Sequence, residues 1–186
     1  MTTICSALEI FILDAKARQC TAPTLEHYRS RIGGFDRWLA IHAPTVGGAL
    51  DAVTHTHIRT YLAHLVDREL SSATVHTHGR ALRAFLNFCT REGLIAASPF
   101  DLVRLGRAAQ MPKLPYTQAD IDKLLAVADL RDTAIVLTLL DTGMRASECI
   151  GLNVNDLVKR RLYIRKGKGR KARTVPIGER SAAAIS

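Results

Sequence analysis

The segment DTGMRASE at residues 141–148 places an arginine at the start of a predicted helix. Thr142 and Gly143 interrupt the preceding apolar run, so Arg145 lies at or near a helix N-terminus, where free N–H groups favour an anion. A guanidinium there offers a planar fork that suits two phosphate oxygens. Glu148, one helical turn further on, is in position to hold that guanidinium. The alternative is a surface Arg–Glu pair, which contributes little.

The segment RKGKGRKAR at residues 165–173 gathers cations at the tip of a predicted β-hairpin. A hairpin projects its tip rigidly, so one lysine can be aimed at a single phosphate, and the glycines allow close approach of the backbone. The alternatives are a solvated basic turn or a general nucleic-acid or localisation patch. From 159 to 173, nine of fifteen residues are basic and none is acidic, so a polyanion is expected near this stretch.

The composition is that of a globular, basic protein. The 186 residues carry a formal charge of +9, and 47% of them are hydrophobic, which excludes global disorder and favours a polyanionic partner. The four cysteines form no CxxC pair, which indicates reduced thiols and a cytoplasmic protein. The first residues have neither a basic leader nor a cleavage site, so no signal peptide or membrane span is expected.

The first hundred residues predict four or five helices in one bundle, because apolar residues recur at helical spacing throughout. Thr24, Thr54 and Ser71 or Ser72 are the expected N-caps. We expect one domain over residues 1–105.

A linker is expected over residues 106–115, where two prolines accompany a loss of apolar periodicity. Residues 116–186 then predict a mixed α/β domain. A helix begins after Thr117, and a second helix near 132–140 is apolar almost all round, so it is expected at the centre of the next core. A short helix over 145–152 and strands over 161–166 and 172–177 follow.

Taken together, these motifs resemble a known family. The run LTLLDTGMRASECIGLNVNDL, then a strand, then KGKGRKARTVPIG, is similar to the start of the catalytic domain of tyrosine recombinases, the phage integrases and Xer-type enzymes. The run SSATVHTHGRALRAF at 71–85 resembles part of their core-binding domain. The resemblance implies a mainly α fold, with an N-terminal SAM-like core-binding bundle and the front part of a mixed α/β catalytic domain that carries a β-hairpin.

The resemblance also implies roles for single residues. Arg145 would bind the scissile phosphate, Lys168 would be the general acid for the departing 5′-oxygen, and Glu148 would support them. Fixed cations suit this role because the pentacovalent transition state gathers negative charge. Lys171 and Arg173 would touch phosphates or brace the hairpin. The DNA-binding candidates are Arg29, Arg31, His76, Thr77, Arg80, Arg83, Lys166, Arg170, Lys171 and Arg173.

No cofactor or metal is expected. The pairs His55-Thr-His57 and His76-Thr-His78 lack the further ligands that a metal site needs, so solvated or DNA-facing histidines are expected there. In the family that the sequence resembles, arginine and lysine side chains neutralise the negative charge of the phosphate. The expected partner is double-stranded DNA, with a homo-oligomer, tetrameric on DNA, in the complete protein.

Two motifs of the family do not occur in these 186 residues. No histidine is followed three residues later by arginine, and no tyrosine lies beyond the hairpin, where the nucleophile belongs. We therefore expect a DNA-binding, catalytically incomplete fragment of an enzyme that cuts and rejoins DNA through a 3′-phosphotyrosine. A natural non-catalytic remnant that occupies recombination sites is the chief alternative, and a generic RNA-binding basic protein is another.

Overall fold

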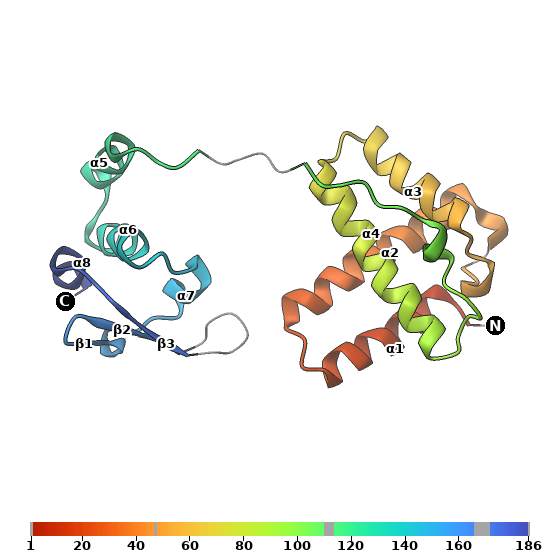
Figure 1. Cartoon of the computed structure of the whole chain (residues 1–186), viewed down its shortest axis with the longest axis horizontal. Coiled ribbons are helices and arrows are strands. Elements are labelled where there is room, and N and C mark those ends of the chain that lie inside the picture. The colour runs from red at the N-terminus through yellow and green to blue at the C-terminus, as the bar shows by residue number, and fades with distance from the viewer. Residues whose placement is uncertain (1, 47, 110–113, 166–171, 186) are drawn as a thin grey trace. The chain divides into compact units, whose positions relative to one another are not determined.

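The computed structural model describes residues 2–46, 48–109, 114–165 and 172–185. The chain divides into two compact units, Met1–Pro112 (unit 1) and Lys113–Ser186 (unit 2), and the division falls inside the segment 106–115 that was expected as a linker. Figure 1 shows unit 1 as a bundle of helices and unit 2 as helices beside a small sheet. The predicted fold class, mainly α with a hairpin-bearing α/β part, is confirmed.

Unit 1 contains four α-helices and short 3-10 turns among its described residues. Their bounds are α1 Ile4–Ala17, α2 Ala22–His42, η1 Pro44–Val46, η2 Leu50–Ala52, α3 His55–Asp67, α4 Ser72–Arg91 and η3 Pro99–Leu102. None of the described helices, in either unit, is long and apolar enough to cross a membrane.

Aromatic side chains join the helices of unit 1. The Phe11 ring of α1 lies edge-on to Tyr28 of α2, at 4.8 Å between centroids, and to Phe85 of α4, at 5.8 Å. The rings of Phe35 of α2 and Tyr61 of α3 lie 5.1 Å apart between centroids. One core therefore ties the four helices together and fixes the helices α2 and α4, which carry the candidate DNA-binding side chains.

Two of the three N-caps predicted for unit 1 are observed in the structure. The side chains of Thr54 and Ser71 accept backbone hydrogen bonds at the starts of α3 and α4, as predicted. The predicted cap at Thr24 is wrong, because α2 begins at Ala22 and its N-cap is Thr21. Pro23 explains the difference: a proline is tolerated within the first helical turn, so it does not force the helix to start after it.

Unit 2 combines helices with a three-stranded antiparallel sheet of order β1-β2-β3. Its elements are α5 Gln118–Val127, α6 Leu130–Thr142, α7 Ala146–Ile150, η4 Val154–Asp156, β1 Leu157–Val158, β2 Arg161–Ile164, β3 Arg173–Pro176 and α8 Glu179–Ile185. The predicted strands correspond to β2 and β3, which pair with Ile164 opposite Arg173.

Strand β1 was not predicted. It is joined to β2 by a two-residue turn in which Lys159 and Arg160 both have positive φ, at 45° and 60°. Such turns usually carry asparagine, aspartate or glycine, which tolerate that conformation. The sequence signal for a turn is therefore missing here.

Helix α6 is less buried than its composition predicts. Leu137 and Thr138 are buried, whereas Ile135 and Leu140 are 36% and 51% exposed. The buried core cluster of unit 2 is formed instead by Met144, Leu162, Ile164 and Ile177. The expectation that α6 occupies the centre of the core is thus wrong for the part of the unit that the structure describes.

We predict that Leu82→Ala lowers the free energy of unfolding of unit 1 by about 2–5 kcal/mol, because Leu82 is fully buried and its removal leaves a cavity. The same substitution at Leu13, which is 68% exposed, is the control and should cost less than about 0.5 kcal/mol. Urea titration followed by the fluorescence of Trp38, the one tryptophan, measures both. Equal losses for the two variants would contradict this core assignment.

Candidate phosphate-binding site

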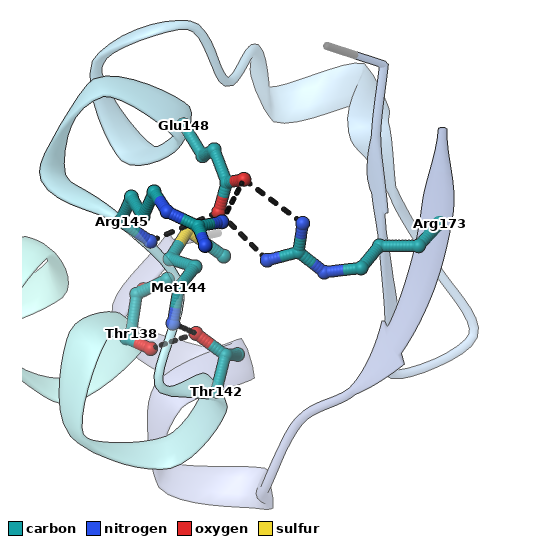
Figure 2. Close-up of polar contacts among 6 residues, drawn as sticks. All are labelled: Thr138, Thr142, Met144, Arg145, Glu148 and Arg173. Atoms are coloured by element: carbon teal, nitrogen blue, oxygen red, sulfur yellow. Dashed lines mark hydrogen bonds and ion pairs between the residues drawn. The ribbon is translucent and has the colours of Figure 1, made fainter. Parts of the chain in front are cut away.

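A tight turn carries the chain from α6 to Arg145. Gly143 ends α6 in the left-handed conformation, with φ of 59°, which glycine adopts without strain. The Thr142 hydroxyl donates to the carbonyl oxygen of Thr138 at 2.6 Å and accepts from the N–H of Met144 at 3.3 Å (Figure 2). Met144 is buried in the core of unit 2. The turn therefore fixes Arg145 as the N-cap residue of α7.

A buried carboxylate joins Arg145 to the hairpin. The side chain of Glu148 is 2% exposed. It accepts from the backbone N–H of Arg145 at 2.9 Å and from Arg145 Nη1 at 3.1 Å. Arg173 of β3 donates Nη1 to Oε1 at 2.9 Å and Nη2 to Oε2 at 2.7 Å, a two-pronged contact that Figure 2 shows beside that of Arg145. Glu148 thereby links α7 to the returning strand.

These contacts keep Glu148 ionised. Hydrogen bonds from Arg173, and then from the backbone of Arg145, lower the pKa of the Glu148 carboxyl to about 2. Conversely, Glu148 raises the pKa of Arg173. Both terminal nitrogens of Arg173 are engaged, so its geometry favours the bracing role over a phosphate contact. Arg145 shares only Nη1, and its side chain is 56% exposed.

A second buried carboxylate holds the other side of the hairpin. Asp156, with a side chain 2% exposed, accepts from the Asn153 N–H at 2.9 Å and from Arg165 Nε at 2.8 Å. The Asn153 hydrogen bond, followed by the Arg165 contacts, lowers the pKa of Asp156. Arg165 and Arg173, the last and first described basic residues on either side of 166–171, are thus both anchored.

Four of the candidate residues lie outside the described residues: Lys166, Lys168, Arg170 and Lys171. Their roles stay predictions. The Asp156–Arg165 pair was missed by the sequence analysis. Asp156 belongs to the run LTLLDTGMRASECIGLNVNDL on which the resemblance rests. No role was inferred for it because pairing across the chain is not visible in the sequence.

In unit 1 the structure brings some candidates together. Arg31 of α2 and Arg80 of α4 lie close enough to His27 to lower its pKa, after the larger effect of burial. Arg83, further along α4, lies over the Phe100 ring at 4.9 Å. His76 is half-buried on the same helix. The structure therefore brings Arg31 and Arg80 together around His27, whereas Arg83 and His76 lie elsewhere on α4.

Other candidates in unit 1 are engaged elsewhere. Arg29 bonds to Glu9 of α1 at 3.3 Å, and the Thr77 hydroxyl donates to the carbonyl oxygen of Ala73 at 2.6 Å. Their DNA contacts stay predictions.

His78 is not the solvated or DNA-facing side chain that was expected. Its Nδ1 lies 3.0 Å from the Tyr61 hydroxyl between α3 and α4. Burial, followed by Arg31 and His27, lowers the pKa of His78 to about 4. The imidazole is therefore neutral near pH 7 and belongs to the packing of the bundle. His57 also has a local role, because its ring accepts from the backbone N–H of Thr54 at the start of α3.

Sequence comparison gives the same division of the chain. The family described as "Phage integrase, N-terminal SAM-like domain" matches residues 14–93, and the "Phage integrase family" matches residues 116–186. The chain belongs to the phage integrase family of tyrosine recombinases. The resemblance inferred from the sequence is confirmed.

Curated relatives include the tyrosine recombinase XerC of Bacillus subtilis (strain 168), 32% identical over 87% of this chain and 55% of its own length. The tyrosine recombinase XerD of Pseudomonas aeruginosa is 32% identical over 84% of this chain and 53% of its own length. This chain therefore spans about half the length of the curated relatives it matches.

Solved structures share the fold. A lambda integrase dimer bound to a COC' core site has a TM-score of 0.76 at 19% identity, over 94% of this chain and 49% of the other. The Tn1549 transposon integrase in complex with transposon right end DNA has a TM-score of 0.75 at 22% identity, over 99% of this chain and 64% of the other. At these identities the likeness concerns the fold alone.

The lowered pKa of Glu148 predicts a pH dependence for unit 2. The carboxylate contributes stability at and above its usual pKa of 4.5, and this contribution is lost as the pH falls toward about 2. Glu148→Gln should therefore lower stability at neutral pH and flatten its dependence between pH 4.5 and 2. Thermal unfolding followed through the amide resonances of α7 and β3 measures both effects.

The matched control is Glu179→Gln, which removes an exposed carboxyl from α8 of the same unit. It should leave the wild-type pH dependence in place. If Glu148→Gln and Glu179→Gln show the same dependence of stability on pH, Glu148 does not hold the cluster together.

Proposed function

We propose that these 186 residues bind duplex DNA and that Arg145 holds a backbone phosphate. The observation that carries the proposal is the arrangement of Arg145 itself. Its backbone and one guanidinium nitrogen are bound by the buried Glu148, while more than half of its side chain is exposed. A guanidinium oriented on one side and open on the other is ready to bind an oxyanion without further ordering.

The charge of the cluster supports an anionic ligand. Two guanidiniums, those of Arg145 and Arg173, share the single Glu148 carboxylate, so positive charge is left over. Within the described residues, Nε and Nη2 of Arg145 have no hydrogen-bond partner, and these are the atoms that would bind two phosphate oxygens. The anchored arginines 165 and 173 would present the basic hairpin, and Lys168 with it, to the same phosphate.

The relatives support the wider role. We propose that the complete protein is a site-specific recombinase that cuts and rejoins DNA in the cytoplasm through a 3′-phosphotyrosine, with Lys168 as general acid, and that it assembles on DNA as a homo-oligomer. Among structural neighbours, the lambda integrase is described as a tetramer bound to a Holliday junction. We further propose that these 186 residues bind DNA without cleaving it, since they contain no His-x-x-Arg motif.

Arg145→Ala should weaken duplex binding about tenfold to a hundredfold, as expected when hydrogen bonds to a charged group worth about 1.5–3 kcal/mol are lost. The slope of log affinity against log salt should fall by about 0.9, the value for one phosphate contact. Fluorescence anisotropy with a labelled duplex, titrated at several salt concentrations, measures affinity and slope together.

Arg180→Ala removes the same charge from α8, outside the Arg145–Glu148–Arg173 cluster, and is the control. It should change affinity by less than Arg145→Ala does. An Arg145→Ala protein that binds like the control, or a wild-type chain that binds duplex RNA as well as duplex DNA, would overturn the proposal.

A further inference from the structure

The chain that leaves η3 is fastened to unit 1 rather than free. Phe100 and Val103 are buried in the core of the unit. Arg59 of α3 donates Nη2 to the carbonyl oxygen of Leu102 at 2.5 Å. Seven residues later, the backbone N–H of Ala109 donates to Ser72 Oγ at the start of α4, at 3.0 Å. Residues 102–109, which we name the strap, are thus held at both ends.

Between these ends, the Leu105 side chain of the strap packs directly against Gly79 of α4. A Cβ built at Gly79 of α4 would lie 2.3 Å from Leu105 Cδ2 and 3.2 Å from Leu105 Cγ. Glycine inside a helix is unfavourable relative to alanine, so its presence in the middle of α4 needs a packing reason. Leu105 supplies that reason, because its side chain occupies the space where a larger residue at 79 would project.

The strap presents two arginines beside His76 of α4. Arg104 and Arg107 flank Leu105 in the sequence and are exposed. Both line a shallow groove with His76, one of the residues expected to contact DNA. Within the described ranges, neither guanidinium has a carboxylate partner, unlike Arg18 and Arg91, which both lie near Asp14. The strap therefore places two cations without a carboxylate partner next to His76, a candidate DNA-binding residue.

We propose that the strap is a further phosphate-binding element, with Arg104 and Arg107 as its contacts and the Gly79–Leu105 contact as the feature that positions them. The proposal rests on the proposed DNA binding. A long, flexible side chain on a free linker loses much conformational freedom when it binds a phosphate. Docking the backbone beforehand removes part of that cost, so the same two arginines bind more tightly from a docked strap.

The docking is tested first, without DNA. Trypsin cleaves after arginine, so a docked strap protects the bonds after Arg104 and Arg107. Gly79→Val should displace Leu105 and make cleavage at these two bonds several-fold faster, and Leu105→Ala should do the same with less risk to folding. Gly33→Val is the control, since the nearest atom to its Cβ would be Arg37 Nη1 at 3.5 Å. Unchanged cleavage in both Gly79→Val and Leu105→Ala would overturn the docking role.

The binding role is tested on the full chain with the labelled duplex. Arg104→Gln with Arg107→Gln should lower the salt slope by about 1.8, for two phosphate contacts. Arg18→Gln with Arg91→Gln removes the same charge and should leave the slope unchanged. In a Leu105→Ala chain, the loss of affinity caused by Arg104→Gln with Arg107→Gln should be smaller, because the arginines are no longer held.

The outcomes separate this inference from the proposed function. If the wild-type chain binds duplex DNA with a steep salt dependence and the Arg104/Arg107 double variant keeps that slope, the strap is not a phosphate-binding element and the proposed function stands. A wild-type chain without salt-dependent duplex binding would overturn both.

Discussion

The Glu148 carboxylate is almost completely buried and joins three parts of unit 2: the start of α7, the side chain of Arg145 and strand β3 through Arg173. Removing a carboxylate from water is unfavourable unless charged donors replace the lost hydration. Two guanidiniums and a backbone N–H provide that replacement. The same contacts hold Arg145 in one orientation and leave part of its guanidinium for a ligand. The stability of the cluster and the anion binding that we propose for it therefore have a single source.

A buried carboxylate also binds an arginine at one end of each of the two hairpin strands, β2 and β3. Asp156 holds Arg165 at the end of β2, and Glu148 holds Arg173 at the start of β3, so each flank is bound by a buried acid. A run of cations as dense as 159–173 would otherwise be a solvated, self-repelling surface. Pairing the two flanking arginines with carboxylates reduces that repulsion and anchors Arg165 and Arg173.

In unit 1, neutral side chains position the helices that carry the candidate DNA-binding residues, whereas in unit 2 ion pairs position Arg145 and the hairpin strands. Its aromatic core fixes α2 and α4, and His78, bonded to Tyr61, is part of that packing because burial keeps its imidazole neutral. The Gly79–Leu105 contact extends the packing to the strap. Arginines on α4 and on the strap are consequently presented by a rigid support, which favours phosphate binding because less conformational freedom is lost.

The sequence by itself determined the helical bundle, the hairpin strands, the turn before Arg145 and the family, because each rests on local periodicity, turn residues or a contiguous motif. It did not determine the start of α2, strand β1 or the limited burial of α6, where the local signal was absent or was overruled by packing. Only the tertiary structure decided the pairing of Glu148 with Arg173 and of Asp156 with Arg165, the packing of His78 and the docking of Leu105 on Gly79. These contacts join residues from 9 to 26 positions apart, and no local pattern encodes such a distance.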